Sequence, residues 1–213
     1  MFRSAQVAIL AALVVLPVSA LQAASLGSDC ITNNLAADCA IGEAQITLDV
    51  LDAGNDQVVF RLENAGPETA TVANIYFDDK DGHLDRIADL IGSVGVSFGE
   101  GGSPKKLPGG NGNPLRFDTD FRAGATSSPS KNGVGSGEWL EILFDLSSGS
   151  SFADVVAALT SGDMIDAALR VGVHVIGYAS EGSESFVATP EPGTATLVAL
   201  GLVALGVTRG RRA

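Results

Sequence analysis

The sequence has few of the residues on which most enzyme chemistry depends. Its 213 residues include two histidines, two cysteines and one tryptophan. No serine or cysteine motif points to His83 or His174 as a catalytic base. Acidic pairs such as Glu138 and Glu141 have the residue type that a glycosidase uses, but such pairs arise by chance in an acidic chain. We therefore expect no catalytic residues and no enzyme, with a secreted hydrolase as the least favoured alternative.

Positive charge is also scarce. Arg3 lies near the N-terminus and three arginines lie at the C-terminus, so residues 25–192 hold nine basic residues against all 25 acidic ones. This region therefore has a net charge of −16. So acidic a domain repels the phosphates of nucleic acids and of anionic lipids, and it attracts cations. We expect no nucleic-acid partner.

The N-terminus lacks a hydrophobic run as long as a membrane span. The run from Val7 to Val18 has 12 residues, whereas a bilayer core needs roughly 20. A basic residue, Arg3, precedes the run, and small residues follow it. This order is typical of a secretory signal peptide. We assign residues 1–24 to one, with cleavage between Ala20 and Ala24; an uncleaved membrane anchor is the alternative.

The two cysteines, Cys30 and Cys39, lie nine positions apart near the start of the mature chain. In an oxidising periplasm an isolated pair is expected to form one disulfide. The alternative is a metal site, which two thiols without neighbouring histidines serve poorly. We therefore predict a disulfide between Cys30 and Cys39 and no metal ligands.

Residues 25–188 have the pattern of a β-rich domain. Apolar residues recur at every second position in several segments, which places one face of each strand in a core: 46–50, 58–62, 139–146 and 169–178. Other strands are expected at 71–77, 94–98 and, as an edge strand, at 183–188, whereas 84–91 fits a helix or a strand. Segments rich in Gly, Pro, Asn and Ser predict two long surface loops, 99–114 and 124–137.

One helix is expected in this domain. Ser151 and Asp154 have the spacing of a capping box, and an apolar stripe follows that includes Phe152, Val155 and Leu159. We therefore predict a mainly β fold, an antiparallel β-sandwich with one short helix. An N-terminal signal-peptide helix and a C-terminal transmembrane helix are expected to flank it.

The C-terminus combines three features in a fixed order: Pro190, Glu191 and Pro192, then an apolar run at 195–207, then a basic tail of Arg209, Arg211 and Arg212. As a helix, residues 193–208 would be about 24 Å long, slightly short of a bilayer core of ~30 Å. We predict a marginal membrane span whose arginines stay on the cytoplasmic side. The alternative is an ordinary membrane anchor behind a proline-rich linker.

This arrangement resembles the sorting signal of PEP-CTERM proteins, which Gram-negative bacteria export. The resemblance covers residues 189–213, and Thr189 departs from the usual apolar residue before the first proline. It implies export through the Sec translocon, an inner-membrane-anchored precursor, and processing near the motif by an exosortase, a membrane-embedded cysteine transpeptidase. The cell surface or the extracellular matrix would be the final location.

Two features of residues 25–188 suggest ligands. The acidic turn Asp79-Lys-Asp-Gly-His-Leu-Asp85 has carboxylates that calcium prefers, but Phe77 stands where an EF-hand has an acidic or amide residue. A solvated turn without cofactor is therefore favoured over a Ca²⁺ site. The alternation of side chains along the predicted strand places Trp139 on the face opposite Leu140, where its ring could stack on a sugar. The alternative is that a loop or a helix covers the Trp139 ring.

We expect a non-enzymatic surface or matrix protein with a structural or binding role. The runner-up is a carbohydrate- or calcium-binding adhesin-like module, for which exopolysaccharide is the candidate partner and Trp139 the candidate ligand-binding residue.

Overall fold

The structure is a computed structural model that describes residues 23–190. Most of the predicted signal peptide and of the predicted sorting signal therefore lies outside the described residues. The described elements are β1 (Ala23–Cys30), α1 (Ala36–Gln45), β2 (Ile46–Gly54), β3 (Gln57–Asn64), β4 (Thr71–Asp79), β5 (Leu84–Gly92), β6 (Phe98–Glu100), β7 (Phe121–Ala125), α2 (Pro129–Asn132), β8 (Glu138–Leu146), α3 (Phe152–Thr160), β9 (Leu169–Ile176) and β10 (Ser183–Pro190).

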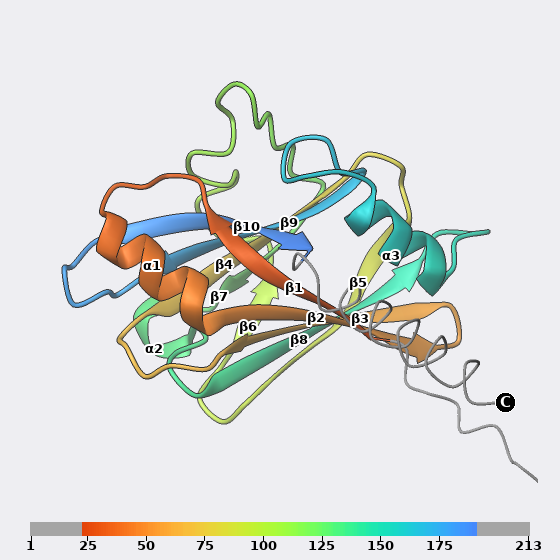
Figure 1. Cartoon of the computed structure of the whole chain (residues 1–213). Helices are drawn as coiled ribbons and strands as arrows, with labels where there is room; N and C mark the ends of the chain where they lie inside the picture. The colour runs from red at the N-terminus through yellow and green to blue at the C-terminus, as the bar shows by residue number, and fades with distance from the viewer. Residues whose placement is uncertain (1–22, 191–213) are drawn as a thin grey trace, which may run out of the picture.

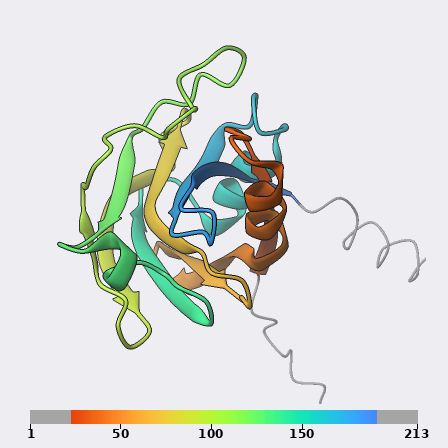
Figure 2. The same ribbon diagram turned by 90° about the vertical axis from the view of Figure 1, so that its left-hand side faces the viewer.

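The ten strands form one antiparallel sheet in the order β5-β8-β3-β2-β1-β10-β9-β4-β7-β6. The sheet curls until its two outermost strands, β5 and β6, lie close together. Figure 2, an end-on view, shows the strands arranged around a single centre. The prediction of a mainly β, antiparallel fold is confirmed. In place of two stacked sheets, the strands make one nearly closed, barrel-like sheet.

The core fills the inside of this sheet. Inward positions of β2, β3 and β8 are almost fully buried and alternate with half-buried or exposed ones, as the period of two predicts. Phe60, Phe77 and Phe144 meet edge to face, with ring centroids 4.8–5.7 Å apart. Each such pair contributes about 0.5–1.5 kcal/mol beyond its burial of apolar area. These aromatic contacts join the two walls of the sheet.

A helix covers each end of the barrel-like sheet, as Figure 1 shows for α1 and α3. The predicted helix is confirmed as α3, and both hydrogen bonds of the Ser151–Asp154 capping box are present. The sequence pattern did not predict α1. It packs so closely on the core that a Cβ at Gly42 would lie 2.1 Å from the Phe186 ring. In the described part of the chain, no helix is long and apolar enough to cross a membrane.

The long loop between β6 and β7 is packed against the outer face of the sheet. Leu107, Leu115 and Phe117 are buried there in a second small core with Tyr76 and Val187. The Tyr76 hydroxyl donates to the Pro104 carbonyl at 3.0 Å, and burial raises the pKa of this phenol to about 12. The segment predicted as a surface loop is therefore anchored by buried side chains.

Three other details differ from the expectation. The ambiguous segment at 84–91 is strand β5, and the strand predicted at 94–98 begins only at Phe98. The predicted edge strand at 183–188 is β10, which lies in the middle of the sheet between β1 and β9. Its inward side chains, including Phe186, are part of the core.

Candidate functional site

The first candidate site is the point where the two ends of the domain leave the sheet. Strand β10 runs antiparallel to β1, and Pro190 is opposite Leu26. Proline has no backbone N–H to donate to a neighbouring strand. On the other side of β1, Ala23 is opposite Leu51 of β2. Both chain ends therefore leave from the same end of the sheet.

The predicted sorting residues follow directly from this strand. Pro190 is the last described residue and still belongs to β10. The other sorting residues, Glu191, Pro192, Arg209, Arg211 and Arg212, lie outside the described residues. The structure thus places the start of the motif at the end of a central strand, with no intervening linker.

The two cysteines lie at the opposite end of β1. A disulfide joins Cys30, at the end of β1, to Cys39 in α1. Their sulfur atoms lie near the carboxylate of Glu184, the one grouping of three potential metal ligands among the described residues. Sulfur atoms in a disulfide do not bind metal as thiolates do. The geometry here favours a covalent tie between sheet and helix.

Glu184 has a structural role in this region. Its side chain is 99% buried, and its carboxylate accepts hydrogen bonds from the backbone N–H groups of Asn34 and Leu35 at 3.0 and 2.7 Å. Leu35 is the N-cap of α1 and supplies no side-chain cap of its own. The Glu184 carboxylate therefore satisfies free N–H groups at the helix start and interacts favourably with the helix dipole.

Trp139 lies on the outer face of β8 and is half-buried. The Arg61 guanidinium lies over its ring, 4.4 Å from the centroid. Arg61 in turn forms an ion pair with Glu141, N–O 2.7 Å, and a longer one with Glu63. The sequence predicts the side of the strand on which Trp139 lies. Arg61 already covers one ring face, so at most the other face is open to a sugar.

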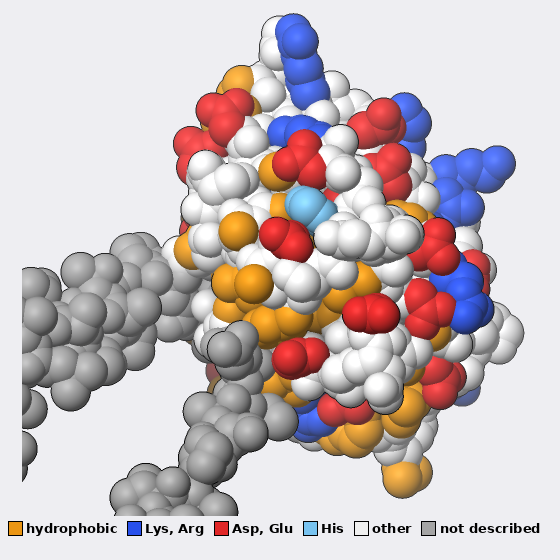
Figure 3. Space-filling view, turned by 90° about the vertical axis from the view of Figure 1, so that its right-hand side faces the viewer, with side chains coloured by type: hydrophobic (Ala, Val, Ile, Leu, Met, Phe, Trp, Pro, Cys, Tyr) orange, Lys and Arg blue, Asp and Glu red, His pale blue; other side chains and the backbone are white. Residues whose placement is uncertain are grey.

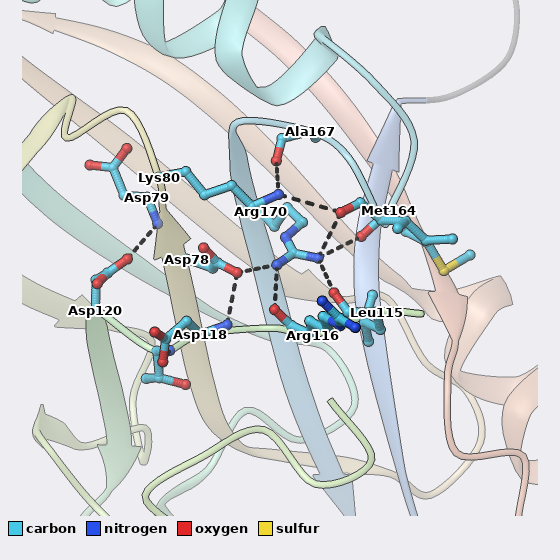
Figure 4. Close-up of polar contacts among 12 residues, drawn as sticks. Asp78, Asp79, Lys80, Leu115, Arg116, Asp118, Asp120, Met164, Ala167 and Arg170 are labelled. Atoms are coloured by element: carbon cyan, nitrogen blue, oxygen red, sulfur yellow. Dashed lines mark hydrogen bonds and ion pairs between the residues drawn. The ribbon is translucent and has the colours of Figure 1, made fainter. Parts of the chain in front are cut away.

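The acidic turn after β4 separates its carboxylates. Within residues 23–190, no three carboxylates of this turn bring oxygen atoms within 4.8 Å of one another. Asp79 is buried and accepts from the Leu84 N–H at 2.7 Å, whereas Asp81 and Asp85 are exposed. Figure 4 shows the Asp78 carboxylate directed to Arg170 and Asp118, and the Asp120 carboxylate accepting from the backbone N–H of Asp79. This arrangement suits a structural turn better than a calcium site.

Asp78 instead pairs with a buried arginine. Its carboxylate binds the Arg170 guanidinium, and both side chains are almost fully buried. Arg170 also donates to backbone carbonyls of two loops, at Leu115, Arg116, Met164 and Ile165. The Asp118 N–H donates to the same Asp78 oxygen at 2.9 Å. As Figure 4 shows, this network fastens the loop before β7 onto the outer face of the sheet.

Each histidine lies beside a serine hydroxyl. The Nδ1 atom of His83 is 3.1 Å from Ser150 Oγ, and that of His174 is 3.2 Å from Ser185 Oγ. Ser185 is fully buried, so a substrate has no access to it as a nucleophile. Burial lowers the pKa of His174, and the Glu184 backbone opposes that shift.

Residues 95–99 match the Gly-x-Ser-x-Gly pattern of a nucleophile elbow, so the expectation that the sequence has no serine motif was wrong. In that role the serine would lie between a strand and a helix. Ser97 lies instead between strands β5 and β6. Its Oγ accepts from Thr126 Oγ1 at 2.9 Å, and neither histidine contacts it. The geometry therefore gives no support to hydrolase chemistry at Ser97.

The hollows of the described structure lie at its surface. Between the two walls of the sheet, the space beside Leu48 and Val173 measures about 10 Å³, too little for an organic ligand. Surface hollows of about 240–370 Å³ lie at the loops, one of them between the β2–β3 turn and the start of α3. Ligand recognition by this domain would therefore use its outer faces.

Comparison with known proteins gives no relative. No protein family, no curated protein and no solved structure matches the chain.

Proposed function

We propose that the chain is an exported surface or extracellular-matrix protein that is processed through its C-terminal sorting signal. In this proposal residues 1–24 are a signal peptide that the Sec translocon recognises. Residues 195–207 form a transmembrane helix in the precursor, and an exosortase acts near Pro190-Glu191-Pro192. The ordered series of motif, apolar run and basic tail supports the proposal most strongly.

The domain itself has a structural or binding role in this proposal. A filled interior, a disulfide and a fastened outer loop suit a rigid unit that is displayed outside the cell. The pairing of Pro190 with Leu26 supports a cut after this position, because an earlier cut would shorten a central strand.

The experiment is a comparison of hosts with and without an exosortase. Membrane fractionation and intact mass are measured for the wild-type chain, for Glu191→Gln in the motif, and for Glu181→Gln as a matched control in the β9–β10 turn. We expect the wild type and the control to lose the C-terminal segment only in the host with the enzyme, and Glu191→Gln to be processed less. Equal mass and location of all three proteins in both hosts would exclude the proposal.

A carbohydrate-binding role for the outer face of β8 is the second candidate. Its one specific observation is the position of Trp139 on that face, opposite Glu63 in the strand pairing and under the guanidinium of Arg61. The test is retention of the protein on exopolysaccharide, compared between wild type, Trp139→Ala and Thr47→Ala, a control on the same face. Loss of retention for Trp139→Ala alone supports stacking, and equal retention of all three excludes it.

A further inference from the structure

The two ends of the domain differ in their relation to the rest of the chain. Strands β1 and β10 are neighbours, and Ala23 and Pro190, the first and last described residues, lie at the same end of the pair. We call this the exit end. Figure 3 faces the exit end. The opposite end has α1 and the turn between β5 and β6.

The chain between the exit end and the apolar run is short. From Pro190 to Ala195 there are five residues, which span at most roughly 18 Å when fully extended. The headgroup layer takes up about 5–7 Å of this distance on one side of the bilayer. Roughly 10 Å of water then remains between the exit end and the headgroups, which is close to the Debye length of about 8 Å at physiological salt.

Exposed carboxylates gather at the exit end, where Lys80 after β4 and Arg86 of β5, paired with Asp145, are the basic side chains. Asp52 and Asp56 flank the β2–β3 turn, next to Ala23 in the sheet, and both line a hollow of about 370 Å³ with the start of α3. Asp154 is exposed on the first turn of α3. On the other side of β10, the loop before β9 has two further exposed carboxylates, Asp163 and Asp166. Figure 3 shows acidic side chains in red around an apolar patch on this face.

Combining these observations, and resting on the proposed membrane-attached precursor, we infer that the exit end faces the membrane and that its carboxylates keep it from adsorbing to anionic lipid. At roughly 10 Å from the headgroups, these carboxylates would lie at about the range of one Debye length, where like charges still repel. The repulsion keeps the exit end, with Pro190, in water. Attachment through either apolar segment gives the same orientation, because both leave from one end.

The test uses the full chain in vesicles of phosphatidylcholine, with and without phosphatidylglycerol, that contain a lipid with a nitroxide on its headgroup. A fluorophore is attached to Ala153→Cys at the exit end or to Val94→Cys at the opposite end, while the native disulfide stays oxidised. Val94 is 99% exposed, and Ala153 is exposed on α3. The two positions are separated by roughly the length of β8, about 27 Å.

We expect the nitroxide to quench the fluorophore at position 153 and not the one at 94. Adding phosphatidylglycerol should reduce the quenching at 153. In an Asp52→Asn/Asp56→Asn background this reduction should be several-fold smaller, whereas Glu68→Gln/Glu181→Gln at the opposite end should leave it unchanged. Asparagine keeps the acceptor that the Gly54 N–H uses at position 52, so the turn is preserved.

The outcomes separate the two proposals. A chain that fails to float with vesicles contradicts the membrane-attached precursor itself. A chain that floats but is quenched equally at both positions contradicts the orientation. Quenching at 153 that does not respond to phosphatidylglycerol, or to the two aspartates, contradicts the repulsive role of the exit end.

Discussion

The buried pair of Asp78 and Arg170 offers the sharpest test of how the outer loop is held. In Asp78→Asn the side chain keeps its size and one acceptor oxygen but loses its charge. The Arg170 guanidinium, which is 2% exposed, is then left in the interior without a counter-ion. Removing one partner of a buried ion pair costs about 3–5 kcal/mol, and we expect the lower end because an amide oxygen remains. Total stabilities are about 5–15 kcal/mol, so the change is large.

The assay is denaturant unfolding of the oxidised protein, with Asp145→Asn as the control. Asp145 also pairs with an arginine, Arg86, but at the surface, where solvent and salt screen the attraction. Hydrogen exchange of residues 107–118 should accelerate in Asp78→Asn, since this loop depends on the pair. A loss of stability no larger than that of the control, with unchanged exchange in the loop, would refute the reasoning.

Three further predictions concern stability. Replacing both Cys30 and Cys39 by serine should lower the free energy of unfolding by about 2–3 kcal/mol, the entropy of closing so short a loop; a thermal midpoint equal to the wild type would contradict this. Because burial lowers the pKa of His174, the neutral ring is favoured in the fold. The stabilisation from the neutral ring should therefore be fully present above the unfolded pKa of about 6.5 and be lost as the pH drops below it. In His174→Gln the urea midpoint of unfolding should change less with pH across this range than it does in the wild type. The pKa of Asp120 is raised, first by burial and then by the neighbouring carboxylates, against the hydrogen bond from the Asp79 N–H; Asp120→Asn should therefore increase stability at neutral pH, and a decrease would show that the charge is favourable there.

The strands in which apolar and polar residues strictly alternate could be predicted from the sequence. In β2, β3 and β8 one face lies in the core and the other in solvent, so side-chain type follows position. Strand β1 has the sequence AASLGSDC, which lacks this alternation. It is a strand because β2 and β10 bind it on both sides, and such tertiary pairing overrides local propensity.

The closure of the sheet and the role of the long loop could not be predicted. The order of strands depends on which distant segments pair, and β10 lies in the centre although it comes last in the chain. The sequence of the loop between β6 and β7 is polar and glycine-rich, yet Leu107 and Phe117 are buried. The close packing of Leu107 depends on Gly172, where a Cβ would lie 2.6 Å from the Leu107 side chain, a contact between residues far apart in sequence.

The candidate sites, too, could be predicted from the sequence only in part. Alternation places Trp139 on the outer face, but only the structure reveals that Arg61 covers its ring. Spacing brings Asp79, Asp81 and Asp85 near one another in sequence, but the strand and turn direct their side chains apart. A ligand site needs side chains to converge, and convergence is a property of the fold.

The intact mass of the exported protein tests the central claim most directly. In a host with an exosortase we expect a product that starts between residues 21 and 25 and ends after Pro190 but before the arginine tail, because Pro190 is still paired with Leu26. A product of the same preparation that retains Arg209, Arg211 and Arg212 would contradict processing through the sorting signal.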